Sequence, residues 1–241
     1  EEVWSMPRLG TFNLHAALLP QYRGAAPINW AVINGENMTG VTTFMIDKNI
    51  DTGGIILRQE HRIAPTDTAG DVHDALMEIG ATLVQETVQG LIEGNVELRV
   101  QRSFIQGSEE LKPAPKLTRE LCHIDWNDST RNVVNLIRGL SPYPAAFTEL
   151  VDGEGKAAQL KVLSAERMSL EGSGPAGEIV SDGRSYLAVR TADGAVSIKE
   201  LQLAGKKRMG VKAFLRGARD LSSMHTSAGT SRAEKTRLCS R

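Results

Sequence analysis

A segment rich in proline and charged residues, 107–119, separates two halves of the sequence that follow different patterns. Before it, short apolar stretches alternate with stretches of helical periodicity. After it, short β-branched stretches are separated by Gly or Asp-Gly turns. The composition of the segment is typical of a linker. A chain of 241 residues is long enough for two domains, so we expect an α/β domain, a linker and a β-rich domain.

Residues 1–106 have the pattern of an α/β domain. Strands are predicted at residues 11–14, 40–46 and 55–63. A helix is predicted at 27–35, with proline near its start and Asn-Gly at its end. A long amphipathic helix is predicted to begin at a capping box formed by Thr68 and Asp71 and to end at Gly94. Because strand, helix and strand alternate, we expect a mostly parallel sheet.

Residues 120–221 are predicted to form a small β-barrel of the OB type. A short helix is expected from Ser129 to Gly139. Five strands are predicted at residues 146–151, 160–164, 177–180, 186–191 and 195–201. Residues 209–221 are predicted to be a closing helix, and residues 222–241, which are rich in Ser, Thr and Arg, to be a disordered tail. Open barrels of this size often bind oligonucleotides.

Charge is distributed unevenly along the chain. Residues 1–110 hold 7 basic and 15 acidic residues, a net charge of −8, and residues 111–241 hold 21 and 14, a net charge of +7. The basic half is therefore a candidate for binding a polyanion. No apolar run approaches the ~20 residues that span a bilayer, and Cys122 and Cys239 have neither metal-ligand nor redox spacing. We expect a cytoplasmic protein that binds neither membranes nor metal ions.

Asn13, His15 and Asp51 are residue types that can transfer an acyl group without a covalent intermediate. Asn13 and His15 are two residues apart on a predicted strand and so share one face. An amide can stabilise an oxyanion, an imidazole can move protons, and a carboxylate can orient the imidazole. An isolated Asn-x-His pair more often satisfies loop backbone groups, so its meaning depends on the surrounding sequence.

The surrounding sequence resembles the folate-dependent formyltransferases. In the first half the matching segments are residues 13–20, 22–28, 39–43 and 51–53. In the second half, the segments that resemble the branch of the family acting on methionyl-tRNA are residues 124–126, 137–145 and 205–209. The resemblance spans residues 1–221. It implies the C-terminal part of a Rossmann-like formyltransferase domain followed by the small barrel.

The resemblance implies transfer of a formyl group from 10-formyltetrahydrofolate to the α-amine of methionine on initiator tRNA, by a monomer. It implies that Asn13 stabilises the tetrahedral oxyanion, that His15 carries the proton from the attacking amine to the leaving nitrogen, and that Asp51 orients His15. The residues expected to contact the folate are Ala17, Leu18, Leu19, Pro20 and Asp47. The residues expected to contact tRNA phosphates are Lys206, Lys207 and Arg208.

The sequence departs from the family pattern at two points. The family places the start of its sheet before the Asn-x-His motif, so the chain resembles an N-terminally truncated enzyme, and we expect the 241-residue piece itself to be inactive. Ala17 also stands where the family usually has Ser, which would weaken one folate contact. Two alternatives stay open. One is a formyltransferase acting on a nucleotide-sugar amine, because such enzymes have a related second domain. The other is a tRNA-binding fragment without catalysis, because the start of the sheet is missing.

Overall fold

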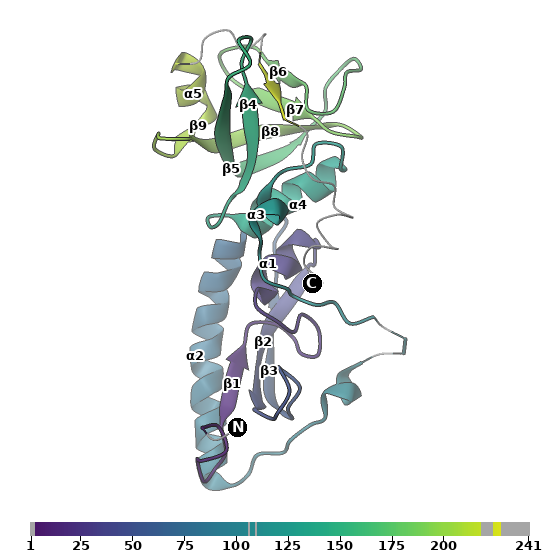
Figure 1. Cartoon of the computed structure of the whole chain (residues 1–241). Coiled ribbons are helices and arrows are strands. Elements are labelled where there is room, and N and C mark those ends of the chain that lie inside the picture. The colour runs from purple at the N-terminus through teal and green to yellow at the C-terminus, as the bar shows by residue number, and fades with distance from the viewer. Residues whose placement is uncertain (1–2, 106, 109, 218–223, 228–241) are drawn as a thin grey trace. The chain divides into compact units, whose positions relative to one another are not determined.

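The structure is a computed structural model that describes residues 3–105, 107–108, 110–217 and 224–227 (Figure 1). It divides into two compact units. The first unit holds residues Glu1–Ala31 and Glu36–Lys116, and the second holds Val32–Gly35 and Leu117–Arg241. Each unit has a sheet of its own. No helix within the described ranges is long and apolar enough to cross a membrane.

The sheet of the first unit has three strands in the order β1-β2-β3. These strands are β1 (Phe12–His15), β2 (Met38–Met45) and β3 (Ile55–Arg62). Both pairings are antiparallel, so the prediction of a mostly parallel sheet is wrong for the described residues. A parallel pair needs a connection that returns along the length of the sheet. Helix α1 (Pro27–Ile33) instead lies in a connection that begins and ends at the same end of the sheet.

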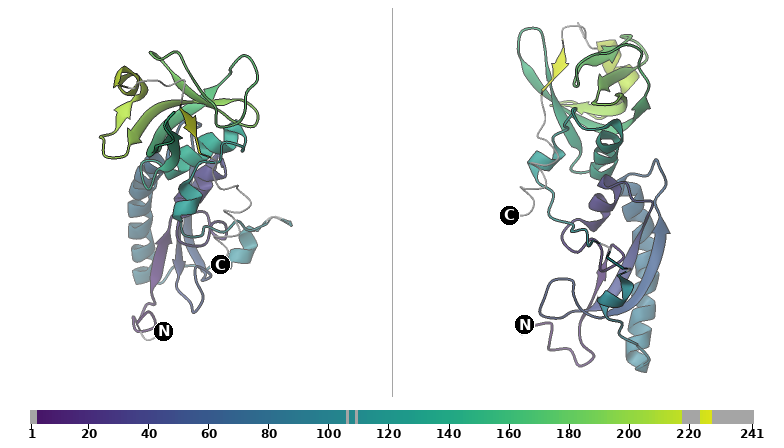
Figure 2. Two further views of the ribbon diagram at one scale, coloured as in Figure 1. Left: turned by 45° about the horizontal axis from the view of Figure 1, so that its top comes forward. Right: turned by 90° about the vertical axis from the view of Figure 1, so that its right-hand side faces the viewer.

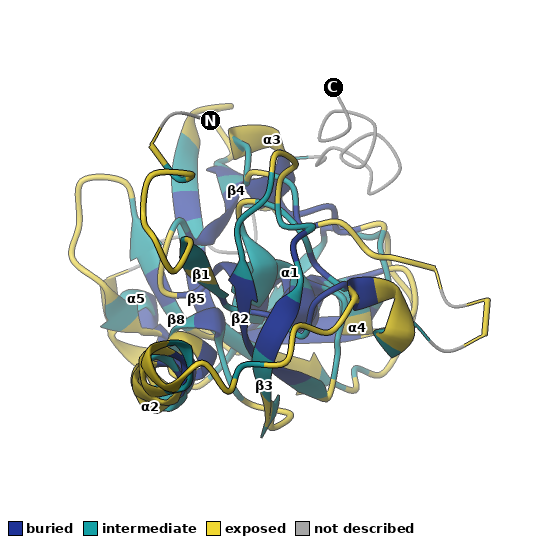
Figure 3. Cartoon of the chain, turned by 90° about the horizontal axis from the view of Figure 1, so that it is seen from below, coloured by how far each residue is buried: buried dark blue, intermediate teal, exposed yellow. Residues whose placement is uncertain are grey.

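Helix α2 (Ala69–Glu93) packs along the sheet of the first unit (Figure 2). It begins at the predicted capping box, in which Thr68 and Asp71 satisfy each other's backbone N–H groups, and it ends at Gly94 in the left-handed conformation. Figure 3 shows the helix along its axis, with exposed residues over much of its outer surface. Its buried residues recur every three or four positions: Ala69, Val72, Leu76, Gly80, Leu83 and Thr87.

The contacts of α2 identify which face of the sheet lies against the helix and which lies opposite it. A Cβ atom on Gly80 would lie 2.7 Å from Leu14 Cδ2, and Thr87 Oγ1 lies 2.8 Å from Thr43 Oγ1. Leu14 and Thr43 therefore point toward α2. Because side chains alternate along a strand, Asn13 and His15 point to the opposite face.

Part of the predicted linker pairs with a loop of the first unit. Ala114 forms a parallel bridge with Gly24. The Ala114 N–H donates to Arg23 O at 2.8 Å, and Ala114 O accepts from Ala25 N at 2.8 Å. The Tyr22 N–H donates to Lys112 O at 2.7 Å. This pairing gives the loop that follows β1 a fixed neighbour.

The sheet of the second unit has seven strands, all paired antiparallel. They are β4 (Ala146–Val151), β5 (Ala157–Met168), β6 (Ile179–Ser181), β7 (Leu187–Arg190), β8 (Ala195–Leu203), β9 (Met209–Gly210) and β10 (His225–Thr226). Their order is β10-β4-β5-β8-β7-β6, and β9 pairs with β8. The two ends of this order approach each other, since Thr226 Oγ1 donates to Gly177 O at 2.8 Å. The sheet is therefore nearly closed and barrel-like.

Among its described residues, the second unit has the helices α3 (Arg119–Cys122), α4 (Thr130–Leu140) and α5 (Val211–Gly217). Helix α4 begins at the predicted Ser129 cap but continues beyond Gly139 to a C-cap at Ser141. Its buried face includes Val133 and Ile137. Leu140, which lies beyond the predicted end of the helix, is fully buried.

Two predictions near the C-terminus are corrected. Met209–Gly210 are a strand rather than the start of a helix, because they pair with Leu201 and Glu200 of β8. His225–Thr226, within the predicted disordered tail, pair with β4. Pairing with a distant strand leaves no periodic signal in the local sequence. Residues 218–223 and 228–241 of these two predictions lie outside the described residues.

Candidate functional site

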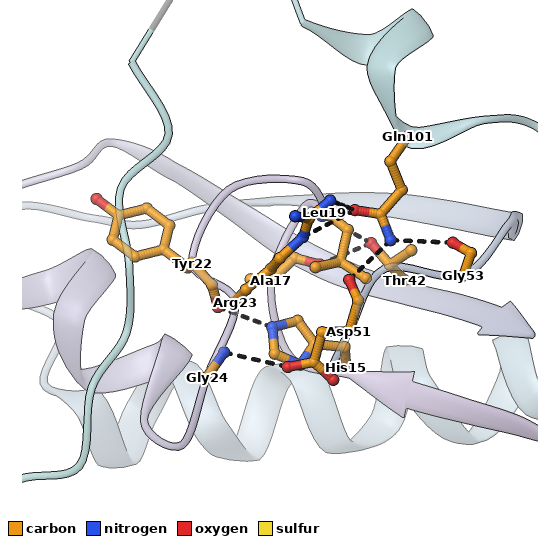
Figure 4. A network of polar contacts seen from close by, with 10 residues as sticks. All are labelled: His15, Ala17, Leu19, Tyr22, Arg23, Gly24, Thr42, Asp51, Gly53 and Gln101. Carbon is orange, nitrogen blue, oxygen red and sulfur yellow. Dashed lines mark hydrogen bonds and ion pairs between the residues drawn. The ribbon is translucent and has the colours of Figure 1, made fainter. Parts of the chain in front are cut away.

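His15 stands at the end of β1, on the face of the sheet opposite α2, and its side chain is only 6% exposed (Figure 4). His15 Nε2 lies 2.8 Å from the carbonyl oxygen of Tyr22. A carbonyl can only accept, so Nε2 must donate. The neutral ring is therefore the tautomer with its proton on Nε2, and Nδ1 carries the free lone pair.

Asp51 faces the other nitrogen of the His15 ring. Asp51 Oδ2 lies 3.9 Å from His15 Nδ1, and the aspartate side chain is 13% exposed. This separation is too long for a direct hydrogen bond. One water molecule can donate to both Nδ1 and the carboxylate, and the carboxylate attracts the ring directly once Nδ1 is protonated. Asp51 Oδ2 also accepts from the Gly24 N–H at 3.1 Å. The structure therefore brings together two of the three predicted catalytic residues, with a backbone group holding each.

Asn13 lies two residues before His15 and on the same face of β1. Its side chain is exposed, and among the described residues it forms no hydrogen bond or ion pair. It stands opposite Phe44 of β2, whose ring contacts His15 edge-on with centroids 6.5 Å apart. The Asn13 amide is thus free to donate to a group bound over this face.

The hydroxyl of Thr42 holds the loop that was predicted to contact folate. Thr42 Oγ1 donates to Ala17 O at 2.7 Å and accepts from the Leu19 N–H at 3.2 Å. The side chains of Ala17, Leu19 and Pro20 are buried, and Leu19 packs against Phe44 and Ile55. Only Leu18 is partly exposed. Contacts of this loop with a ligand therefore fall mainly to its backbone and to Leu18.

Asp47, the remaining predicted folate contact, shapes the loop that presents Asp51. Its Oδ1 accepts from Thr52 Oγ1 at 2.7 Å and from the Asn49 N–H at 2.9 Å. These hydrogen bonds, led by that from Thr52, hold the pKa of Asp47 below its usual range. Both contacts are internal to the loop, and a folate contact of Asp47 stays a prediction.

Gln101 is a site residue that the sequence did not reveal. It lies in a short 3₁₀ helix, η1 (Gln101–Phe104), and its side chain is buried. Its Nε2 donates to Asp51 O at 2.9 Å and to Gly53 O at 3.0 Å. Its Oε1 accepts from Nε and Nη2 of Arg23, at 3.1 and 2.5 Å. A glutamine in a segment without helical or strand periodicity carries no sequence signal of such a role.

Known proteins match both units of the chain. A family model described as "Formyl transferase" matches residues 1–88, and one described as "Formyl transferase, C-terminal domain" matches residues 116–219. The methionyl-tRNA formyltransferase of Parabacteroides distasonis is 53% identical over 92% of this chain, which covers 68% of that protein. The chain belongs to the methionyl-tRNA formyltransferase family. The predicted resemblance is thereby confirmed.

Two solved structures share the fold of this member of the methionyl-tRNA formyltransferase family. HypX from Aquifex aeolicus, solved in complex with tetrahydrofolic acid, has a TM-score of 0.62 and 22% identity, over 86% of this chain and 35% of that one. An N-formyltransferase from Helicobacter canadensis, solved with folinic acid and dTDP-3-aminofucose, has a TM-score of 0.57 and 21% identity, over 82% and 66%. At these identities the likeness shows the fold alone.

The three residues predicted to contact tRNA in this methionyl-tRNA formyltransferase family member are exposed. Lys206, Lys207 and Arg208 follow β8 and precede β9 in the second unit. Arg208 pairs with Glu200, whereas Lys206 and Lys207 have no ion pair among the described residues. Backbone groups fix the turn, since the Lys206 N–H donates to Leu203 O at 2.9 Å. The two lysines are thus the more available cations of the run.

No group of three or more His, Cys, Asp or Glu side chains in the described part of the chain is arranged to hold a metal ion. Cys122 lies in the second unit, where it is buried and its Sγ donates to Thr118 O. It belongs to a different unit from His15. The predicted catalytic residues Asn13, His15 and Asp51 all lie in the first unit.

Proposed function

We propose that the protein transfers a formyl group from 10-formyltetrahydrofolate to the α-amino group of methionine on initiator methionyl-tRNA. The family assignment supports the reaction, and the arrangement around His15 supports its mechanism. The mechanism rests on one observation: the two nitrogens of the His15 ring have different partners. Nε2 donates to Tyr22 O, whereas Nδ1 faces Asp51.

The reaction does not need a covalent intermediate. An α-amine has a pKa of about 8 and is partly neutral near pH 7, so it can attack the formyl carbon directly. The carbonyl oxygen becomes an oxyanion, to which the Asn13 amide donates. One oriented donor of this kind contributes ~10²–10³ in rate. Collapse of the tetrahedral intermediate then breaks the bond to the folate nitrogen.

His15 moves the proton that this exchange of nitrogens requires. The attacking amine loses a proton and the departing folate nitrogen gains one, so a single base can serve both steps, at ~10²–10⁴ in rate. We assign this transfer to Nδ1, because the Nε2 proton is held by Tyr22 O. Asp51 would stabilise the imidazolium that forms when Nδ1 takes up the proton.

We further propose that the first unit is the C-terminal part of a Rossmann-like domain and that the second is an OB-like barrel that binds the tRNA. The net charge of +7 in residues 111–241 supports attraction of a polyanion. Lys206, Lys207 and Arg208 would contact phosphates, which position the tRNA without reading its sequence.

The test compares amine acceptors. Full-length protein that contains these 241 residues is incubated with 10-formyltetrahydrofolate and either methionyl-tRNA or a dTDP-amino sugar, and formylated product is quantified. We expect formyl-methionyl-tRNA, and loss of it in the His15→Ala variant. Preferential formylation of the sugar would favour the nucleotide-sugar alternative, and tRNA binding without formylation of either acceptor would favour the non-catalytic one.

A further inference from the structure

One buried amide ties together the two loops that hold the His15 ring. Gln101 is 4% exposed and comes from η1, which is remote in sequence from both loops. Its NH₂ group binds the backbone of Asp51 and Gly53, and its oxygen binds the guanidinium of Arg23 (Figure 4). The side chain therefore uses its donors on one loop and its acceptor on the other.

We propose that Gln101 is a positioning residue that sets the geometry of His15 and Asp51. Arg23 stands between Tyr22, whose carbonyl accepts from His15 Nε2, and Gly24, whose N–H donates to Asp51 Oδ2. Holding Arg23 in place therefore constrains the two backbone groups that contact the catalytic pair, the Tyr22 carbonyl and the Gly24 N–H. The inference rests on the proposed roles of His15 and Asp51, but its test does not depend on turnover.

The chemistry of the contacts allows only one orientation of the amide. Arg23 offers only donors, so the Gln101 oxygen must face it. The carbonyls of Asp51 and Gly53 can only accept, so the NH₂ group must face them. If the amide were flipped, its NH₂ group would face the N–H donors of Arg23, and its oxygen would face the carbonyl oxygens of Asp51 and Gly53. Both ends of the side chain are therefore specified, and a residue with one kind of polar atom cannot replace it.

Asp51 needs this external support because of its own backbone. Its φ is +54°, in the left-handed region that non-glycine residues rarely occupy. Such a conformation persists only where the surroundings over-determine it. The bond from Gln101 Nε2 to Asp51 O supplies one such constraint from outside the loop.

A simpler explanation is that Gln101 is a buried polar residue that has merely found partners. The two explanations differ in what they predict at a distance from Gln101. A residue that only contributes packing would change stability when replaced. A positioning residue would also change the hydrogen bond between the Gly24 N–H and Asp51 Oδ2 and the proton distribution on the His15 ring, and Gln101 contacts none of these atoms directly.

The experiment measures those two reporters by NMR on the ¹⁵N-labelled chain. Gln101→Met keeps a similar volume and removes every hydrogen bond of the side chain. We expect the Gly24 amide to exchange with solvent about tenfold faster, as loss of one hydrogen bond would allow. We also expect the ¹⁵N shifts of the His15 ring to move from those of the Nε2–H tautomer toward a mixture of tautomers.

Gln101→Glu distinguishes the contacts with the Asp51 and Gly53 carbonyls from the contact with Arg23. A carboxylate keeps the contact with Arg23 but cannot donate to Asp51 O or Gly53 O. We expect this variant to lose protection at Gly24 while His15 retains the Nε2–H tautomer. Thr87→Val is the matched control, since it removes a buried hydroxyl beneath the opposite face of the same sheet; it should lower stability and leave both reporters unchanged. Wild-type reporters in Gln101→Met would overturn the proposal.

Discussion

At the scale of single residues, the site depends on backbone groups as much as on side chains. The Tyr22 carbonyl sets the tautomer of His15, and the Gly24 N–H holds the carboxylate of Asp51. Neither contact depends on the side chain of the residue that makes it. Substitution of Tyr22 is therefore expected to affect the site less than substitution of Asn13, His15 or Asp51.

Asn13→Ala should lower kcat/KM for formylation ~10²–10³-fold, because it removes a donor aimed at the oxyanion. KM for methionyl-tRNA should change little, since the interaction forms only in the transition state. Steady-state kinetics on full-length protein that contains these 241 residues measure both constants. Gln89→Ala, on the exposed side of α2, is the control and should match wild type. An unchanged kcat/KM in Asn13→Ala would exclude the amide from the chemistry.

The sequence predicted the side chains of this site but not the residues that support them. Asn13, His15 and Asp51 are recognisable because they lie in long matching segments. Gln101 has no such context, and its importance comes from burial and from contacts with residues 50 and 78 positions away. Local patterns cannot reveal a contact of that range.

At the scale of elements, local rules predicted the helices well where their ends are capped by neighbouring residues. Thr68 and Asp71 form the predicted capping box of α2, and Ser129 caps α4. The strand directions were predicted less well, because an antiparallel and a parallel sheet can share the same alternation of strands and helices. The short strands β9 and β10 were missed because two residues carry no period.

Thr68→Ala should lower the free energy of unfolding by about 0.5–2 kcal/mol, since one backbone donor at the start of α2 loses its partner. Thermal or denaturant unfolding followed by circular dichroism measures the change. Thr82→Ala, an exposed position in the middle of α2, is the control and should be neutral or slightly stabilising. Equal effects of the two substitutions would argue against a role for the cap.

The same cap should make stability depend on pH. Hydrogen bonds from the Thr68 hydroxyl and backbone N–H hold the pKa of Asp71 below its usual range. A carboxylate with a lowered folded pKa stabilises the fold above its unfolded pKa of about 3.9, and this contribution is lost as pH falls through the folded value. The stability difference between wild type and Asp71→Asn should therefore shrink in acid. A difference that grows below pH ~4 would contradict this.

Gly53→Ala tests the turn that carries Asp51. A Cβ atom at residue 53 would lie 1.6 Å from the carbonyl oxygen of Met45, and backbone cannot move aside as a flexible side chain can. We expect a loss of at least ~1–3 kcal/mol in the free energy of unfolding, by analogy with overpacked sites. Gly217→Ala, where nothing lies within 4 Å, should be neutral. Comparable stability of the two variants would show that the turn can rearrange.

At the scale of the whole molecule, the two halves of the sequence differ both in net charge and in their proposed roles. The acidic half carries the proposed catalytic residues, and the basic half carries the proposed tRNA contacts. A phosphate contact contributes to affinity through the release of counterions, so its signature is a dependence on salt concentration.

Lys206→Ala combined with Lys207→Ala should weaken tRNA binding about equally for initiator and elongator tRNAs. The slope of log affinity against log salt concentration should become shallower by about 1 for each phosphate that is no longer neutralised by a lysine. Filter binding or fluorescence anisotropy over a salt series measures it. Arg62→Ala, on β3 of the first unit, is the control. An unchanged slope in the double variant would remove the turn between β8 and β9 from the tRNA interface.

The bond between Thr226 and Gly177 has a consequence for how copies of the chain meet one another. An open sheet ends in two strands with unpaired N–H and C=O groups, and such edges can recruit strands from other molecules into aggregates. In this sheet β10, at one end, donates instead to Gly177, which lies two residues before β6 at the other end. The Thr226 hydroxyl thus occupies a carbonyl group beside the β6 edge to which a strand of another molecule could otherwise donate.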